Sequence, residues 1–192
     1  MDITVTAAIN QVAREMWSMY INDTGYPSVT DIIRPFIDSQ WFTDDSRNRG
    51  SFVHQAVAAY LNGVWSPPLP MPWQPYFDGA KDWIDRMVDR VLVVEQRFVD
   101  ADKGFCGKPD LIAVIKGDDG PTLIDWKTSA SYQKWWPVQI AAYRHLARVN
   151  GHPTIRGMSV RLHDSLPIVA EASGARDYDV FVSLLNAYKY FN

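Results

Sequence analysis

Cysteine is nearly absent, with one residue, Cys106, in 192. A single thiol excludes an internal disulfide framework and any zinc or iron–sulfur site that needs four cysteine ligands. Long apolar runs are absent too, because no stretch reaches the ~18 residues of a membrane-spanning helix. The first residues, Met1 to Thr4, lack the basic start and apolar stretch of a signal peptide. We therefore expect a cytoplasmic protein with no membrane partner.

Positive charge is also in short supply: 19 Lys and Arg face 22 Asp and Glu, for a net charge of -3. Since phosphate contacts supply most nucleic-acid affinity, this balance argues against extensive coating of DNA and for a narrow local groove. The length and the 47% hydrophobic share predict one domain, residues 1–192. Its first part, 1–90, is expected to be mainly helical, and 91–192 to form the sheet core.

Hydrophobic spacing predicts the elements along the chain. Helices are expected at 7–20, from Ser28 or Thr30 to 37, and at 49–62, 77–90, 134–149 and 177–191. Strands are expected at 91–99, 107–115, 121–128, 158–163 and near 168–171, with hairpin turns at 102–104 and 117–120. Five prolines between 66 and 75 indicate a rigid connector. The order predicts an α/β (α+β) fold in which a three-strand antiparallel meander belongs to a mixed sheet flanked by helices.

Charged side chains occur where the expected strands are most apolar. Asp125 and Lys127 are two residues apart, so they share a face of one strand, and a hairpin register can bring Asp110 beside them. Isolated charges are costly in a sheet buried on both faces. Two converging carboxylates form an oxygen-rich site for Mg²⁺ or Mn²⁺, and Lys127 could orient a water or neutralise charge on a phosphate. The alternatives are turn chemistry at Asp110 and a same-face ion pair between Asp125 and Lys127.

Several short motifs occur in one order along the chain. They are Arg49-Gly50-x-x-x-His54, Pro109-Asp110, Asp125-x-Lys127 and Gln139-x-x-x-Tyr143, with Glu95 on the first expected strand. Together they resemble the PD-(D/E)xK nuclease superfamily, and more narrowly its RecB-type exonuclease branch, which includes phage exonucleases and the mitochondrial genome maintenance exonuclease. The resemblance extends roughly from residue 27 to 146. It implies a restriction-endonuclease-like core.

The resemblance also implies roles for individual residues. Those expected to hold the metal are His54, Asp110, Asp125 and the carbonyl of Trp126, with Glu95 as a further possibility. Those expected to be catalytic are Asp110, Asp125, Lys127, Gln139 and Tyr143, of which the last two border the site. Two alternatives stay open: His54 as a core histidine and Glu95 as an ion-pair partner of Arg97. The cluster-bearing members of the family carry four cysteines, so no iron–sulfur cluster is expected here.

Four residues are candidates for contact with the substrate. Arg49 and Lys108 would contact phosphates, as would other basic residues that include Arg144. Trp135 and Trp136 could stack unpaired bases, although core packing is the alternative for both. The implied substrate is DNA, single-stranded or at duplex ends, and a helicase or recombinase would be a separate protein.

The implied function is metal-dependent hydrolysis of DNA phosphodiester bonds. The resemblance favours an exonuclease in recombination, repair or phage DNA metabolism, inside a bacterium or a phage-infected cell. Two alternatives are a structure-selective endonuclease that uses the same site and a non-catalytic DNA-binding recombination accessory protein. Both would keep the fold.

Overall fold

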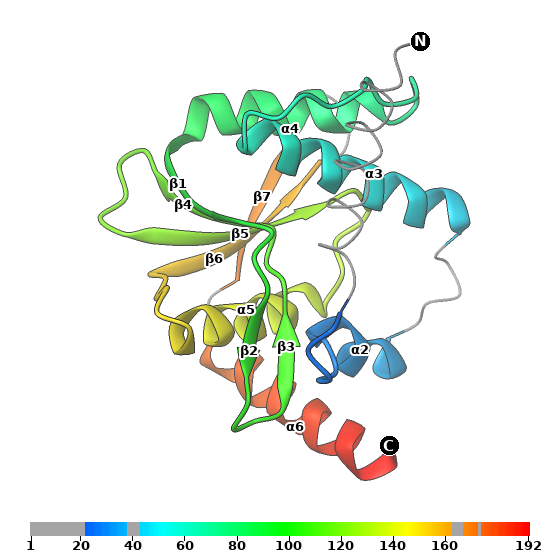
Figure 1. The fold of residues 1–192 in the computed structure, drawn as a ribbon, viewed down its shortest axis with the longest axis vertical. Coiled ribbons are helices and arrows are strands. Elements are labelled where there is room, and N and C mark those ends of the chain that lie inside the picture. The colour runs from blue at the N-terminus through cyan, green and yellow to red at the C-terminus, as the bar shows by residue number, and fades with distance from the viewer. Residues whose placement is uncertain (1–21, 38–42, 163–166, 173) are drawn as a thin grey trace, which may run out of the picture.

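A computed structural model describes residues 22–37, 43–162, 167–172 and 174–192. The expected helix at 7–20 lies outside these residues. A five-stranded sheet forms the centre, in the order β1-β4-β5-β6-β7 (Figure 1). Its strands are β1 (Val88–Val94), β4 (Leu111–Ile115), β5 (Pro121–Lys127), β6 (Arg156–Arg161) and β7 (Ile168–Ala172).

The sheet is mixed, as expected from the sequence. Strands β1, β4 and β5 form the antiparallel meander. Helix α5 (Trp136–Val149) then returns the chain so that β6 pairs in parallel with β5, and β7 closes the sheet antiparallel to β6. A separate two-stranded ribbon consists of β2 (Phe98–Asp100) and β3 (Phe105–Gly107).

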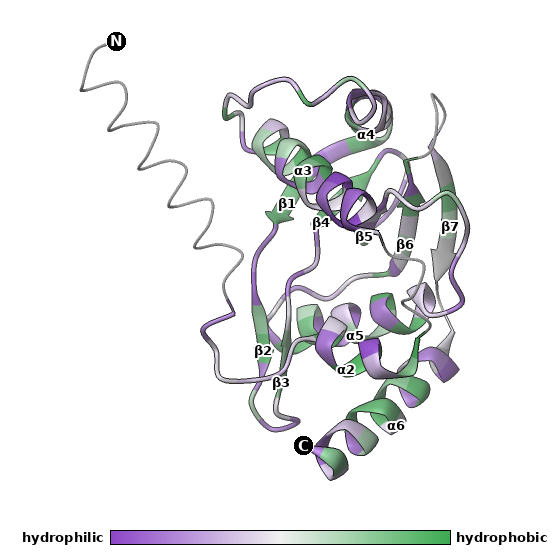
Figure 2. Ribbon diagram, turned by 90° about the vertical axis from the view of Figure 1, so that its right-hand side faces the viewer, coloured by the Kyte–Doolittle hydropathy of each residue, from purple (hydrophilic) through white to green (hydrophobic). Residues whose placement is uncertain are grey.

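Helices cover both faces of the sheet, as Figure 1 shows. On one side lie α3 (Asp44–Leu61) and α4 (Gln74–Met87). On the other lie α5, α6 (Ala175–Phe191) and α2 (Val29–Ile33), which continues into the 3₁₀ turn η1 (Arg34–Phe36) (Figure 2). None of the helices in the described part of the chain combines the length and apolar character that crossing a membrane requires.

Two hydrophobic cores result, one on each face of the sheet. Successive side chains of a strand point to opposite faces. Leu111 and Ile124 therefore join the core under α3 and α4, whereas Ile112 and Leu123 join the core against α5 and α6. All four are fully buried or nearly so. The apolar runs of β4 and β5 are thus continuous because both faces of these strands are buried, as the sequence predicts.

Most expected elements are present, but two expected strands are each divided. The range 91–99 is divided between the last residues of β1 and the strand β2, and 107–115 is divided between β3 and β4. The segment after β1 and the segment before β4 leave the main sheet side by side and form the ribbon. The amide of Glu95 donates to the carbonyl of Asp110 at 3.0 Å where they leave. We call the place where Glu95 and Asp110 form this hydrogen bond the fork of the sheet.

Helix ends differ from expectation by a few residues, for identifiable reasons. Helix α3 begins at Asp44, five residues early, because the side chain of Thr43 caps it by accepting from the amide of Ser46 at 3.2 Å. Helix α4 ends at Met87 because Val88 already pairs with β4. At α2, Ser28 is the N-cap rather than Thr30.

Candidate active site

A cavity of about 260 Å³ opens beside the fork of the sheet. Its walls come from α2, α3, the segments at the fork, β5 and α5. Its lining residues are Thr30, Gly50, Ser51, His54, Glu95, Lys108, Asp110, Asp125, Lys127, Gln139 and Tyr143. Seven of these residues are ones that the sequence predicted to be catalytic or metal-binding. They come from distant segments, since His54 and Tyr143 are 89 residues apart in the sequence.

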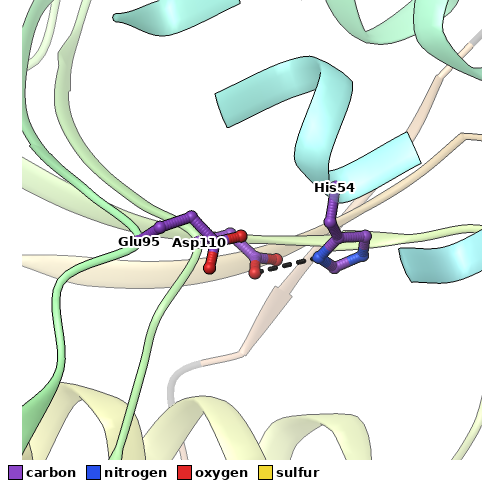
Figure 3. Close-up of side chains that lie close together, drawn as sticks. All are labelled: His54, Glu95 and Asp110. Carbon is purple, nitrogen blue, oxygen red and sulfur yellow. Dashed lines mark hydrogen bonds and ion pairs between the residues drawn. The ribbon is translucent and has the colours of Figure 1, made fainter. Parts of the chain in front are cut away.

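Asp110 connects three of these segments. One carboxylate oxygen, Oδ1, lies 3.0 Å from Nδ1 of His54, and the other, Oδ2, accepts the backbone amide of Trp126 at 2.7 Å. Figure 3 shows the His54 ring directed from α3 toward this carboxylate. Asp110 is only 6% exposed, so these donors supply the partners that a buried carboxylate needs. The contact accounts for His54 without a core carbonyl.

Glu95 joins this pair from the end of β1. One donor atom each from His54, Glu95 and Asp110 lies within 4.8 Å of the other two (Figure 3). Glu95 also forms an ion pair with Lys108, whose side chain is 13% exposed. Among the described residues other than glycine, only Glu95 has a positive φ, of 50°. A carboxylate is thus held at the cavity by an unfavourable backbone conformation.

The charges of this group shift one another's pKa values. Burial lowers the pKa of His54, but the carboxylates of Asp110, Glu95 and Asp125 outweigh burial and raise that pKa to about 9. Burial, reinforced by Asp110, raises the pKa of Glu95 to about 7 against the opposing effect of Lys108. Negative charge is therefore concentrated beyond what the neighbouring cations neutralise.

The two aspartates respond in opposite directions. Burial raises the pKa of Asp110, yet the field and hydrogen bond of His54 outweigh burial, so that the net shift is downward. Burial also raises the pKa of Asp125, and there Lys127 compensates only in part, so that the net shift is upward. A cation in the cavity would neutralise the charge of Asp125 that Lys127 leaves uncompensated.

Lys127 is held from several sides. Its ammonium donates to Oε1 of Gln139 at 2.6 Å, pairs with Asp125 and lies 5.1 Å from the ring centre of Trp135. Gln139 in turn donates to the hydroxyl of Tyr143 at 3.2 Å. Burial raises the pKa of Tyr143, so the phenol stays protonated. The Gln139-x-x-x-Tyr143 spacing places both residues on the face of α5 that borders the cavity.

The backbone of Trp126 also faces this region. The carbonyl of Lys127 accepts from Leu162 on the β6 side at 2.7 Å, whereas the amide of Trp126 donates to Asp110 on the β4 side. In a strand the N–H and C=O of one residue point to the same side, and those of the next residue to the other. The Trp126 carbonyl is therefore directed to the Asp110 side. Its indole is buried in an edge-on contact with Trp83.

Two of the four expected substrate residues occupy other places. Arg49 does not line the cavity: it donates to the carbonyl of Thr128 at 3.3 Å, and its guanidinium lies 5.1 Å from the ring centre of Tyr76. It braces the chain that follows β5. Trp136 is only 2% exposed. This burial favours the core alternative over base stacking, whereas Trp135 remains half-buried beside Lys127.

The structure adds two cavity residues to those expected from the motifs. Ser51 precedes His54 by three residues, and helical spacing alone indicates that both share a face of α3. Thr30, a candidate helix cap from the sequence, lines the cavity from α2. Its place there depends on how α2 packs against α5, which no local pattern encodes.

Two solved structures share this fold at low sequence identity. The crystal structure of SSO0001 matches with a TM-score of 0.50 and 16% identity, over 98% of this chain and 87% of that one. A protein from Eubacterium rectale that is named a putative exonuclease matches with a TM-score of 0.51 and 11% identity, over 88% of this chain and 80% of that one. No family model matches the chain, and neither does any curated protein.

Proposed function

We propose that this chain is a metal-dependent deoxyribonuclease that hydrolyses phosphodiester bonds from DNA ends. The observation that carries the proposal is the meeting of His54, Glu95, Asp110, Asp125 and Lys127 in one cavity. The name of the structural neighbour from E. rectale supports a nuclease. The sequence motifs support the RecB-type branch of the PD-(D/E)xK superfamily, and with it an exonuclease in recombination, repair or phage DNA metabolism.

The donor atoms fit a divalent cation. Two ligands of one Mg²⁺ or Mn²⁺, each at about 2.1 Å from the ion, lie up to ~4.2 Å apart. The atoms of His54, Glu95 and Asp110 lie within 4.8 Å of one another, so a small side-chain movement would bring them to that separation. Asp125 lines the same cavity, and the carbonyl of Trp126 is a further proposed ligand. Carboxylate-rich sets of this kind suit Mg²⁺ or Mn²⁺.

The cation would supply Lewis-acid chemistry, polarising a phosphate oxygen and activating a water. The chain's own residues supply position and charge. The Lys127 ammonium, fixed between Asp125 and Gln139, is placed to neutralise charge that develops on the phosphate. Tyr143 holds Gln139, and Gln139 holds Lys127, so both act as positioning residues. Lys108, and Trp135 at the rim, are the proposed contacts for phosphate and an unpaired base.

A cleavage assay tests this function. Wild-type protein and the Asp125→Asn variant are incubated with end-labelled linear DNA and closed-circular DNA, single- and double-stranded, in Mg²⁺, Mn²⁺ or EDTA. Asp89→Asn, the same chemical change at an exposed strand position, is the matched control. We expect degradation of linear DNA only, abolished by EDTA. We also expect a loss of about 1,000-fold in the Asp125→Asn variant, because metal catalysis contributes several kcal/mol.

The other outcomes have equally definite meanings. Cutting of closed circles would make the protein an endonuclease with the same site. Full activity in the Asp125→Asn variant would overturn the site assignment. Binding without cleavage under every condition would favour an accessory protein that acts beside a separate recombinase or helicase.

A further inference from the structure

A second pocket, of about 220 Å³, lies on a different face of α5. It is an open pocket between α5, the loop that follows α5, and α6. The two helices pack together below the sheet (Figure 2). Its lining residues are Ala141, Arg144, His145, Arg148, Pro153, Thr154 and Tyr178. We call it the basic pocket, because two arginines and a histidine line it and no described carboxylate does.

Arg144 brings a positive charge into this pocket without a carboxylate. Its guanidinium donates to the hydroxyl of Thr154 at 3.2 Å, to the carbonyl of Thr154 at 3.0 Å and to that of Ile155 at 3.2 Å. These acceptors are all neutral, and burial lowers the pKa of Arg144. A half-buried cation is costly unless an anion compensates it. Within the described residues, no Asp or Glu lies at ion-pair distance from Arg144, and its Nη1 makes no hydrogen bond.

Arg148 is oriented by a buried network. The Nε2 atom of His145 lies 2.6 Å from the Asp100 carboxylate, which leaves Nδ1 to face the Arg148 guanidinium at 3.3 Å. Asp100 is engaged a second time by the amide of Lys103 at 2.9 Å. This one contact draws the exposed Arg148 guanidinium toward the pocket, while most of its five N–H groups remain available.

Tyr178 adds a donor that the fold does not use. Its ring stacks on His145, with centroids 4.6 Å apart. Its hydroxyl oxygen is buried and has no hydrogen-bond partner in the described part of the chain. Burial raises the pKa of Tyr178 to about 12, so the group is an O–H donor at neutral pH. A buried polar group without a partner calls for an explanation, and a ligand oxygen supplies one.

We propose that the basic pocket binds a phosphoryl group through Arg144, Arg148 and the Tyr178 hydroxyl. Paired guanidinium groups match the oxygens of phosphate, which are acceptors only. The volume is below the ~300 Å³ at which pockets for larger ligands begin, so it suits one phosphate with little attached. Two sources share this chemistry: a phosphodiester of a bound DNA strand, or the phosphate of a free mononucleotide. The first rests on the proposed nuclease function; the second stands without it.

The test compares variants in the uncleaving Asp125→Asn background. Arg148→Gln removes one cation, and Tyr178→Phe removes only the unpartnered hydroxyl. Arg86→Gln, the same change at an exposed position on α4, is the matched control. Binding of a fluorescent single-stranded oligonucleotide is measured by anisotropy across salt concentrations. Binding of inorganic phosphate and of a deoxynucleoside monophosphate is followed by NMR shifts of the amides from 141 to 154.

If a strand occupies the pocket, Arg148→Gln lowers the slope of log affinity against log salt by about 0.7, and Arg86→Gln leaves that slope unchanged. Tyr178→Phe weakens binding and leaves Tm unchanged. If the hydroxyl had only a structural role, its removal would lower Tm instead. Shifts with phosphate and the mononucleotide, beside unchanged oligonucleotide affinity, would assign the pocket to the free ligand. The proposal is overturned if neither ligand is affected by the Arg148 and Tyr178 changes. Failure of the nuclease function would appear separately, as absent cleavage by the wild-type protein.

Discussion

Glu95 combines a carboxylate that lines the cavity with a strained backbone, and the two can be separated by mutation. A non-glycine residue at a left-handed φ, here 50°, costs about 1–2 kcal/mol. Glycine removes that strain but loses more freedom on folding, at about 0.5–1 kcal/mol relative to alanine. Glu95→Gly and Glu95→Ala both delete the carboxylate. We therefore expect the glycine variant to be more stable than the alanine variant by about 0.5–1 kcal/mol.

The measurement is urea unfolding of the metal-free proteins, with thermal scans as a second readout. In a chain of this size about 1 kcal/mol corresponds to a Tm difference of ~2–4 °C. The same pair of substitutions at Asp89, an exposed residue of β1 without a positive φ, is the control, and there alanine should be the more stable. Both Glu95 variants should lose metal affinity alike. Equal stability of the two, or the same order at both positions, would refute the strain argument.

Three further predictions concern other parts of the chain. Burial raises the pKa of Asp100, but its contacts with His145 and the Lys103 amide together outweigh burial and give a net lowering. The resulting stabilisation is present above the unfolded pKa of about 4 and is lost as pH falls through the folded value. Asp100→Asn should therefore lower the free energy of unfolding by about 2 kcal/mol at pH 7. In urea titrations, the variant should lose less of this free energy than the wild type between neutral and strongly acid pH. An unchanged pH profile would contradict the pairing of Asp100 with His145. Gly107→Ala would place a methyl 2.7 Å from the Tyr143 ring, so calorimetry should show destabilisation of about 1–3 kcal/mol; a neutral effect would mean that the ring moves freely. Mn²⁺ at a hundredfold excess over its Kd should raise the unfolding free energy by about 2.7 kcal/mol in the wild-type protein, but not in an Asp110→Asn variant, and equal gains would exclude Asp110 as a ligand.

Local patterns were sufficient to predict the sheet and the convergence of its polar residues. The apolar runs and the turn between β4 and β5 predicted the meander, and the two-residue spacing of Asp125 and Lys127 predicted a shared face. In the structure both side chains line the cavity with Asp110. Strand periodicity and hairpin register are short-range properties, so they can be deduced from one sequence. The catalytic and metal-binding roles remain predictions until cleavage is measured.

The remaining features depend on contacts between distant segments. The division of two expected strands at the fork has no signal of its own, because the apolar pattern continues through it. A positive φ at Glu95 is equally unforeseeable, since glycine and asparagine are the usual residues there. Arg144 was expected among the basic residues near the nuclease site. The structure places it in the basic pocket instead, because helix rotation turns it away from its neighbour Tyr143.

The fork of the sheet has a consequence for how this protein can change over evolutionary time. The hydrogen bond between Glu95 and Asp110 closes the base of an excursion that includes β2, β3 and their turn. Residues can be inserted at that turn without altering the separation of the two carboxylates, because the register of β1 and β4 is set on the other side of the bond. The turn of the ribbon is thus free to change in length while the carboxylates of Glu95 and Asp110 stay in place. New contacts can be acquired there without rebuilding the chemistry.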